Sequence, residues 1–369
     1  MNDVPIRILQ VFGILNRGGA ETFIMNVYRN INRSKIQFDF IVHSEEKGAY
    51  EDEIEKLGGK IYRVPTYKGK NHFKYKKAWC NFFKTNLTYR IIHGHMRSTA
   101  SIYLKIAKQF GLKTIIHSHS TSSGKGLNSI VKNIMQYNIR YIADYLFACS
   151  KVAGLWLYGN KFCKHSNFYI INNAIDTEKF IYNEEIREQK RKELNIENKF
   201  VVGNVSRFAP PKNHMFLLDI FSEISKENSN TALMLVGDGE LRGEIENRIE
   251  ILGLKDNIIL TGLRSDVNDL LQTMDIFLFP SLWEGFPVTL VEAQTSGLHC
   301  VVSDSITEEG KITNLAEYVS LKKSTSYWAE QILHYTNGYE RKNMQEEIIK
   351  AGFDIKKTAY WLQKFYLGV

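Results

Sequence analysis

Acidic residues are missing from a long internal part of the chain. No Asp or Glu occurs between Glu55 and Asp144, and those 88 residues hold 17 Lys and Arg. Residues 1–176 carry 26 Lys and Arg against 11 Asp and Glu, a net +15, whereas the rest carries 22 against 29, a net −7. The sequence therefore predicts a basic lobe and an acidic lobe. The basic lobe is expected to bind nucleic acid, an anionic membrane surface or a phosphorylated lipid carrier.

Long apolar runs and clustered cysteines are missing as well. No window reaches the apolar length of a membrane-spanning helix. The start, MNDVPIRILQVFGIL, lacks the layout of a signal peptide, because its apolar run reads as a buried strand before a glycine loop. We therefore expect a cytoplasmic protein. The cysteines have no metal or redox spacing and are expected to be buried thiols; they are Cys80, Cys149, Cys163 and Cys300.

Strand-like apolar runs alternate with helical stretches along the chain, which is typical of doubly wound α/β domains. Since 369 residues exceed the usual size of a single core, two domains are expected. In the first part, strands are predicted at 6–12, 38–42, 60–64, 91–94, 113–118, 145–148 and 168–171. In the second part, they are predicted at 200–204, 232–236, 258–261, 276–279, 300–303 and 318–320. Ligands of such sheets gather beyond the carboxyl ends of the strands.

A basic and aromatic segment lies at residues 67–84, YKGKNHFKYKKAWCNFFK. Its mixture of lysines and aromatic residues fits a helix at a membrane interface. The alternative is a solvated helix whose aromatic side chains pack inward, which is the usual explanation of amphipathicity. Nucleic-acid binding is favoured least, because the chain has no recognised binding motif.

The segment at residues 279–304, FPSLWEGFPVTLVEAQTSGLHCVVSD, predicts a short helix flanked by acids. Pro287 has the fixed φ and the missing N–H that suit a first helical position. Gly297 suits the left-handed residue just past the end. Glu284 then lies before the helix, and Glu292 a little over one turn inside it.

The start of this helix is a predicted anion site. Val288, Thr289 and Leu290 would present unpaired backbone N–H groups at the positive end of the helix dipole. The Cβ of Glu292 tilts back toward the N-terminus, so its carboxylate can reach hydroxyls beside a bound phosphate. Carboxylates next to a phosphate indicate a polyol such as a sugar. The alternative is a solvated Glu292 on an amphipathic helix.

Two motifs in the basic lobe follow predicted strands. NRGGAETF opens a helix after the first strand, where Gly18 and Gly19 let the backbone turn tightly and approach a ligand; plain turn chemistry is the alternative. KTIIHSHS ends a central strand, and alternation places His117 and His119 on the same side of it. His95, in IIHGHMRS, is a weaker candidate of the same kind.

Three further motifs follow strands of the acidic lobe. VGNVSRFAPPKNH holds Arg207 and Lys212, two cations that can neutralise a diphosphate, although surface solvation is the default for isolated basic residues. VGDGELR supplies a glycine turn at Gly237, and TGLRSDV places Leu263 and Arg264 after the next strand. The alternative is that the turn glycines have a purely structural role.

Taken together, these motifs resemble the E-x7-E signature of retaining glycosyltransferases of sequence family 4, which have the GT-B architecture. The resemblance covers nearly the whole chain: the GGAE loop, the histidine after a central strand, the Arg and Lys pair, and the GDG turn follow one another in the expected order. One departure is Cys300, where relatives commonly carry proline. The resemblance implies two Rossmann-like doubly wound domains facing across a cleft. Their expected bounds are 1–176 with a returning C-terminal helix at about 353–369, and 177–352.

The resemblance also implies roles for the candidate residues. Glu284 is expected to bind sugar hydroxyls and Glu292 the ribose diol, with Arg207, Lys212 and the helix start on the diphosphate. His119 is expected near the reacting centre, with His117 as its support, and the Gly18–Gly19 loop there as well. The other expected donor-binding residues are Gly237, Leu263, Arg264, Phe286, Pro287, Val288, Thr289 and Leu290.

The expected reaction is the transfer of a hexose-type sugar, with retention, from a nucleoside-diphosphate sugar to an acceptor hydroxyl. UDP is the expected nucleotide. The acceptor is expected to be a glycan linked to a polyprenyl diphosphate, in exopolysaccharide or capsule synthesis. Such an acceptor is compatible with a peripheral location of the protein on the inner face of the cell membrane. We expect no cofactor and no metal, because no cluster of acids suggests one. The alternatives are another GT-B sugar-nucleotide enzyme, such as an epimerase or a phosphorylase, and a non-catalytic module that binds sugar nucleotides or nucleic acid.

Overall fold

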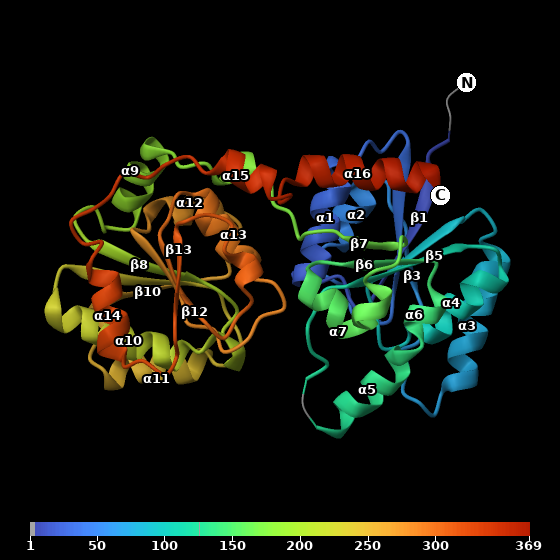
Figure 1. Cartoon of the computed structure of the whole chain (residues 1–369), viewed down its shortest axis with the longest axis horizontal. Helices are drawn as coiled ribbons and strands as arrows, with labels where there is room; N and C mark the ends of the chain where they lie inside the picture. Colours follow the sequence, from blue (N-terminus) through green and yellow to red (C-terminus); the bar gives the residue numbers. More distant parts are fainter. Residues whose placement is uncertain (1–3, 125) are drawn as a thin grey trace. The chain divides into compact units, whose positions relative to one another are not determined.

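The chain divides into two compact units in a computed structural model that describes residues 4–124 and 126–369 (Figure 1). Unit 1 consists of Met1–Ala174 and Asp354–Val369, and unit 2 of Ile175–Phe353. Within the described residues, each unit is built on one parallel β-sheet with helices on both faces. The predicted fold class, α/β with two Rossmann-like domains, is confirmed.

The sheet of unit 1 has seven strands among the described residues. They are β1 (Ile6–Phe12), β2 (Ile36–Val42), β3 (Ile61–Arg63), β4 (Ile91–Gly94), β5 (Lys113–Ser118), β6 (Tyr145–Ala148) and β7 (Phe168–Ile170). Their order is β3-β2-β1-β4-β5-β6-β7, and neighbouring strands are parallel. Parallel strands place all their carboxyl ends at one edge, and the winding direction reverses between β1 and β4.

The helices of unit 1 cover both faces of its sheet. They are α1 (Gly19–Asn30), α2 (Glu51–Lys56), α3 (His72–Thr85), α4 (Ala100–Gln109), α5 (Leu127–Tyr137), α6 (Ile139–Ile142), α7 (Lys151–Phe162) and α16 (Ile355–Gly368). Helix α16 lies beside α1 (Figure 1), and its buried Leu362 and Tyr366 join one core with Ile24 and Phe38. It starts at Asp354, whose side chain accepts the Lys357 N–H at 2.8 Å, as an N-cap residue should.

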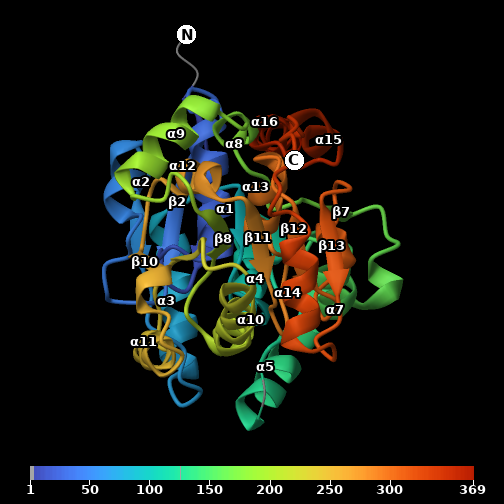
Figure 2. The same ribbon diagram turned by 90° about the vertical axis from the view of Figure 1, so that its left-hand side faces the viewer.

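Unit 2 repeats the same winding pattern with six strands (Figure 2). They are β8 (Phe200–Val205), β9 (Thr231–Val236), β10 (Ile258–Gly262), β11 (Ile276–Phe279), β12 (Cys300–Ser303) and β13 (Ala316–Val319). The order is β10-β9-β8-β11-β12-β13, so the reversal lies between β8 and β11. Beyond the carboxyl ends of these two strands a ligand site is expected.

Two hydrophobic cores stabilise unit 2, one on each face of the sheet. Helices α10, α11 and α14 contribute to one, and α12 and α13 to the other. The helices are α8 (Thr177–Phe180), α9 (Glu184–Glu193), α10 (His214–Glu227), α11 (Arg242–Ile251), α12 (Val267–Thr273), α13 (Val288–Thr295), α14 (Thr325–Leu333) and α15 (Gln345–Lys350). Short 3-10 turns lie at η1 (Pro210–Lys212), η2 (Lys255–Asn257) and η3 (Glu308–Gly310).

All the predicted strands are present, and the differences lie at their ends. Strand β2 starts two residues early, because Ile36 and Gln37 continue the register with Ile6 and Arg7 of β1. Strand β13 is shifted toward Ala316, which pairs with Cys300 of β12. These boundaries depend on strand partners that a local pattern does not contain.

The basic and aromatic segment at residues 67–84 packs its aromatic side chains inward. In α3, Tyr75, Trp79 and Phe83 are at most 1% exposed, whereas Phe73 is 85% exposed. The inward-packing alternative is therefore the one that holds, and the interpretation of this segment as a membrane-interface helix is wrong.

The cysteines and the helix lengths bear on two further expectations. Cys149 and Cys300 are buried thiols as predicted, but Cys80 and Cys163 are only half-buried. Within the described part of the chain, no helix combines the length and apolar character needed to cross a membrane.

We predict that Gly297→Ala destabilises the fold more than Gly338→Ala. Both glycines have left-handed φ angles, +69° and +78°, so each alanine should cost about 1–2 kcal/mol from the backbone alone. At Gly297 a Cβ would also lie 2.6 Å from the Lys342 carbonyl oxygen, whereas at Gly338 nothing lies within 4 Å. Urea unfolding of the two variants measures the difference. Equal losses of stability would contradict the close contact.

Candidate functional site

The loops that follow β8 and β11 are joined to each other at the reversal point of the second sheet. The Leu282 N–H donates to the Pro211 carbonyl at 2.8 Å, and the Asn213 side-chain amide donates to the Pro280 carbonyl at 3.1 Å. Between them, Lys212 Nζ lies 2.6 Å from Glu284 Oε1. Two residues predicted from separate motifs therefore meet in one place.

The ion pair between Lys212 and Glu284 is mostly buried. The two side chains are 21% and 10% exposed, and the Lys212 ammonium lies 5.2 Å from the centre of the Phe279 ring. Because each charge is balanced by the other, the pair carries no net charge toward a ligand. A diphosphate or a sugar hydroxyl would share Lys212 or Glu284 with its present partner. The lysine also fixes the orientation of the carboxylate.

The start of α13 differs from the predicted anion site. The helix starts at Val288, so Pro287 occupies the N-cap position rather than the first helical one. The Val288 N–H donates to the Phe286 carbonyl and the Leu290 N–H to the Pro287 carbonyl, both at 3.1 Å. The chain turns tightly before the helix and uses these donors itself. The prediction of unpaired N–H groups is therefore wrong for Val288 and Leu290, whereas Thr289 stays a candidate.

Side chains at the same turn are used for packing. Phe286 is 9% exposed and stacks on Phe353, with ring centres 5.2 Å apart and planes inclined by 15°. Leu290 is fully buried in the core that α13 shares with β11 and β12. Any contact of these two residues with a donor would use the backbone. The left-handed Gly297 after α13, at φ +69°, is confirmed.

Glu292 lies in α13, and its carboxyl group has an unusual pKa. Burial raises the pKa of its carboxyl from 4.5 to about 7. Its side chain is half-buried rather than solvated, so the alternative of a solvated glutamate is wrong. Because burial destabilises the ionised carboxylate, a hydrogen bond donated by a ligand hydroxyl would stabilise that form. The position is suited to a ligand diol.

Arg207 points toward an acid that sequence reasoning missed. Its Nη2 lies 2.8 Å from Glu240 Oε2, and the side chains are 71% and 50% exposed. An ion pair so exposed contributes little to stability, which leaves Arg207 able to exchange partners. Glu240 directly follows the GDG turn of the VGDGELR motif, and that position was the available signal.

The glycine of the GDG turn has a structural role. A Cβ on Gly237 would lie 2.0 Å from the Ser206 carbonyl oxygen, so the two strand ends approach too closely for any side chain. After β10, Leu263 is 72% exposed and Arg264 is held by Asp266 at 2.6 Å. The structure thus leaves Leu263 open to a ligand and gives Arg264 an internal partner.

The glycines at the start of α1 do not need left-handed backbone angles. Gly18 is the N-cap residue with φ −89°, and Gly19 starts the helix. The tight-turn reason for these glycines is therefore wrong. A Cβ on Gly19 would have nothing within 4 Å, so open space lies above it. Close approach of a ligand to the backbone remains the functional reason.

Histidines gather on one face of the sheet of unit 1. His93 and His95 come from β4 and the residue after it, and His117 and His119 from β5 and the residue after it. The rings of His117 and His119 lie 3.9 Å apart, and those of His93 and His117 are nearly parallel. Burial lowers the pKa of all four, to about 3 for His119, so they are neutral at neutral pH.

A hydrogen-bonded chain sets the proton positions in this histidine cluster. Gln10 Oε1 faces His95 Nε2 at 2.9 Å, and His95 Nδ1 faces His119 Nε2 at 2.8 Å. Because the Gln10 carbonyl oxygen only accepts, His95 carries its proton on Nε2 and accepts through Nδ1. His119 then donates from Nε2 and keeps a bare Nδ1. That nitrogen is buried and makes no well-formed hydrogen bond among the described residues; the Asn173 side chain is a polar neighbour of His119, and Asn173 Oδ1 is likewise unpaired.

Three of these histidines could hold a metal ion. One nitrogen each from His93, His95 and His117 lies within 4.8 Å of the others. However, both ring nitrogens of His95 are engaged with Gln10 and His119, and the parallel planes of His93 and His117 do not direct their lone pairs at a common point. This arrangement fits stacked neutral rings better than a tetrahedral metal site.

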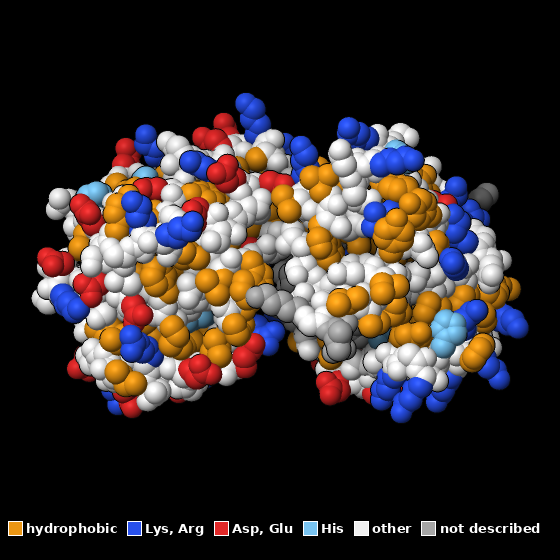
Figure 3. All heavy atoms as spheres, turned by 60° about the horizontal axis from the view of Figure 1, so that its bottom comes forward, with side chains coloured by type: hydrophobic (Ala, Val, Ile, Leu, Met, Phe, Trp, Pro, Cys, Tyr) orange, Lys and Arg blue, Asp and Glu red, His pale blue; other side chains and the backbone are white. Residues whose placement is uncertain are grey.

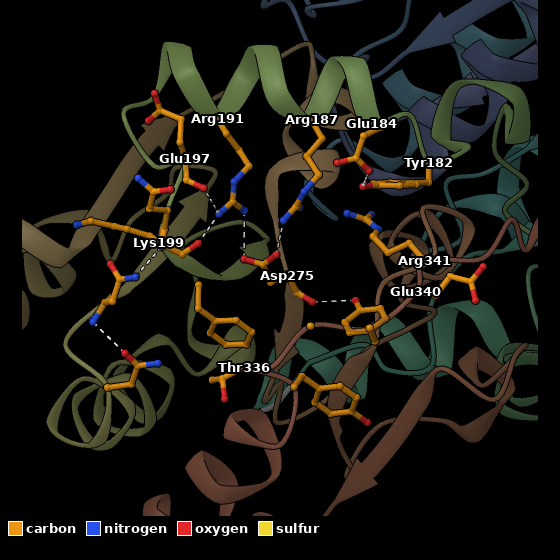
Figure 4. A pocket seen from close by; sticks show the side chains of 17 residues that line it. Tyr182, Glu184, Arg187, Arg191, Glu197, Lys199, Asp275, Thr336, Glu340 and Arg341 are labelled. Carbon is orange, nitrogen blue, oxygen red and sulfur yellow. Dashed lines mark hydrogen bonds and ion pairs between the residues drawn. The ribbon is translucent and has the colours of Figure 1, made fainter.

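A pocket of about 590 Å³ lies at the opposite end of the second sheet (Figure 4). It is lined by Asp275, just before β11, and by Arg187, Arg191 and Arg341. The arginines donate to backbone carbonyls at the end of α12, and Arg187 and Arg191 also bind Asp275. Because these donors are engaged in capping α12, the pocket is structural. Arg187 and Arg191 therefore anchor helix α9 to the end of α12.

Two family models match the chain, one for each unit. The model "Glycosyltransferase Family 4" matches residues 17–179, and "Glycosyl transferases group 1" matches residues 185–352. The second match contains Arg207, Lys212, Glu284 and Glu292.

Whole-chain comparisons agree with these models. EpsF of Bacillus subtilis (strain 168), named as a glycosyltransferase, is 33% identical over 99% of this chain and 97% of its own. The capsular polysaccharide biosynthesis glycosyltransferase CapH of Staphylococcus aureus is 27% identical over 98% and 99%. A UDP-Gal:α-D-GlcNAc-diphosphoundecaprenol α-1,3-galactosyltransferase of Escherichia coli is 27% identical over 73% and 72%. The structure of Anabaena HepE with UDP and glucose has a TM-score of 0.81 at 17% identity, over 99% and 100%.

We predict that Glu292→Gln raises stability relative to the wild type at high pH only. The carboxyl has a pKa of about 7 in the folded chain and an ordinary value of 4.5, so the wild type loses stability as pH rises between these values. The neutral amide has no such loss. Urea unfolding from pH 4 to pH 8, with the exposed Glu250→Gln as a control for charge removal, measures the effect. A pH-independent difference would contradict the pKa.

We also predict that His95 and His119 carry their protons on Nε2. The ¹⁵N chemical shifts of the ring nitrogens report this directly, and protons on Nδ1 would contradict the Gln10 orientation. Gln10→Leu should lower the free energy of unfolding by about 1–3 kcal/mol, because it leaves the buried His95 N–H without an acceptor.

Proposed function

Because the chain belongs to the group 1 glycosyl transferases of family 4, we propose a specific reaction for it. It transfers the hexose-type sugar of a UDP-sugar to a glycan hydroxyl, with retention of the anomeric configuration. The chain is a glycosyltransferase by its family. The observation that carries the finer proposal is the meeting of Lys212 and Glu284 at the reversal point of the second sheet, with α13 and Glu292 directly after it. Cations, a carboxylate and a half-buried acid are the groups that a sugar nucleotide requires.

In this proposal, the diphosphate binds to basic groups of unit 2. Lys212 would exchange part of its contact with Glu284 for a phosphate oxygen, and the exposed Arg207 would leave Glu240. The Thr289 N–H adds a donor at the helix start. Two cations would stabilise the charge that grows on the diphosphate as the sugar leaves. We expect that no metal is needed for this, and no other cofactor.

The two glutamates would hold the neutral parts of the donor. Glu284, once Lys212 turns partly toward phosphate, accepts hydrogen bonds from sugar hydroxyls. Glu292 accepts from the ribose diol, which favours its ionised form and thereby lowers its pKa on binding. Leu263 and Arg264 are proposed as contacts of the base. Gly237 adds backbone only.

Retention is proposed to follow from attack on the face of the sugar that the diphosphate leaves. The transition state would be oxocarbenium-like, with the leaving phosphate accepting the proton of the acceptor hydroxyl. His119, neutral in the folded chain, is proposed to lie near the hydroxyls of the donor sugar and the reacting centre. The loop with Gly18 and Gly19 is proposed to approach the reactants through its backbone.

The acceptor is proposed to be a glycan carried on a polyprenyl diphosphate, in capsular or extracellular polysaccharide synthesis. Relatives support this class: the Escherichia coli relative is named for a diphosphoundecaprenol acceptor and the Staphylococcus aureus relative for capsular polysaccharide. The basic charge of unit 1 suits a phosphorylated lipid. A position on the inner face of the cell membrane belongs to the same proposal.

A screen of UDP- and GDP-sugars tests the proposal. We expect a UDP-sugar to raise the melting temperature and to be hydrolysed slowly without acceptor. Glu284→Ala and Arg207→Ala should lower kcat by about 10²–10³-fold, as for the loss of a group that stabilises transition-state charge. Asp219→Ala and Arg248→Ala are matched controls, because Asp219 and Arg248 form a comparable ion pair on α10 and α11.

The outcomes separate the alternatives. If no sugar nucleotide stabilises the protein and the variants behave like their controls, the proposed donor site is wrong. Stabilisation without turnover of any sugar nucleotide would indicate a binding module. Conversion of the sugar nucleotide to an epimer would indicate an epimerase.

A further inference from the structure

The helix α5 turns its apolar side outward. Ile130, Val131, Ile134 and Tyr137 are between 54% and 69% exposed, and Tyr141 on α6 is 63% exposed. At 100° per residue the four α5 positions fall within about 120° of arc. The Tyr141 ring lies 6.3 Å from that of Tyr137, so the five side chains form one stripe. We call these five residues the α5 stripe.

The opposite side of the same helix is polar and buried. Ser129 and Gln136 are 9% and 6% exposed. The Gln136 amide donates to Ser123 Oγ and to Asn133 Oδ1, and the Ser129 hydroxyl donates to the Gly126 carbonyl. An amphipathic helix of a soluble domain normally buries its apolar face. This reversed orientation indicates an external apolar partner, because large contiguous apolar patches are rare on the surfaces of monomeric proteins.

The charge around the stripe identifies the class of partner. Helices α4 and α7 contact α5, contain no Asp or Glu, and carry the exposed lysines Lys105, Lys151 and Lys161. Unit 1 as a whole has 29 Lys and Arg against 11 Asp and Glu, a net +18. Figure 3 brings the side of α5 forward and shows hydrophobic groups on unit 1 with far more blue than red around them. An anionic surface would meet attraction here.

The stripe has the composition of a membrane interface. Two of its five residues are tyrosines, whose apolar rings and polar hydroxyls suit the headgroup level. The Arg140 guanidinium lies 4.6 Å from the centre of the Tyr137 ring, which keeps a cation beside the stripe. Helix α7, which contacts α5, also carries two partly exposed apolar side chains, Val152 at 39% and Leu155 at 37%.

We propose that the α5 stripe docks unit 1 onto the surface of an anionic lipid bilayer. The apolar side chains enter the boundary between headgroups and acyl chains, while the lysines of α4 and α7 meet the headgroups. Binding is peripheral and reversible. The inference rests on the proposed function only in one respect, since a lipid-linked acceptor gives the docking its purpose.

Vesicle sedimentation with the full chain tests the proposal. Vesicles of phosphatidylglycerol and phosphatidylcholine should bind the wild type, and vesicles of phosphatidylcholine alone should bind it weakly. Ile134→Glu should lower the partition coefficient about tenfold or more, because it adds a repelled charge where an apolar side chain was inserted. Ile134→Lys should lower it less. Added salt should weaken wild-type binding.

A matched control lies in unit 2. Ile251 is 66% exposed against 69% for Ile134, so Ile251→Glu makes the same chemical change at equal exposure. It should leave vesicle binding unchanged. Phe73→Glu on α3, with 85% exposure of the phenylalanine, should also have little effect. A loss as large with Phe73→Glu as with Ile134→Glu would place the docking surface elsewhere and overturn the proposal.

Three other results would overturn it. They are equal binding to neutral and anionic vesicles, full binding by Ile134→Lys, and a wild-type dimer in sedimentation velocity that Ile134→Glu dissociates, since the stripe would then bind a second copy. UDP-sugar hydrolysis without lipid should be unchanged in Ile134→Glu. Turnover of a UDP-sugar without vesicle binding would overturn only the docking proposal. Vesicle binding without turnover would overturn only the proposed function.

Discussion

Parallel strand pairing is the constraint on which both units depend. Parallel neighbours require a crossover between them, so every loop that follows a strand reaches the same edge of its sheet. In the second sheet, this brings together the loops after β8 and β11, although Lys212 and Glu284 are 72 residues apart in the chain. The ion pair then holds those loops in place. Without the shared edge, the two motifs would have no reason to meet.

Much of the fold could be predicted from the sequence, because the signals for strands and helices are local. Each strand is an apolar run bounded by turn residues, and α13 lies between a proline and a left-handed glycine, as expected. The sequence did not show which side of an amphipathic helix is buried. Helices α3 and α5 both have apolar and polar sides, yet Trp79 is buried and Ile134 is exposed. Tertiary neighbours decide which side is covered, and no local pattern contains them.

The same distinction applies to the site. Alternation along β5 placed His117 and His119 on one side, and the motif order predicted the loops with Lys212 and Glu284. The partners were not predictable, because they come from distant segments: Gln10 is 85 residues from His95, and Glu240 is 33 residues from Arg207. The turn before α13 was missed for another reason. Its N–H groups are satisfied by carbonyls one and two peptides away, a detail of backbone angles rather than of residue type.

The position of α16 in unit 1 has a consequence for how the chain folds during synthesis. Unit 2 is continuous in sequence, whereas the core of unit 1 includes Ile355, Ala359 and Leu362. As the chain leaves the ribosome, residues 4–174 emerge first but lack the helix that covers Ile24 and Phe38. Unit 2 can therefore complete its two cores before unit 1 closes its own. During that interval, the face of α1 is an exposed apolar surface, a natural target for a chaperone.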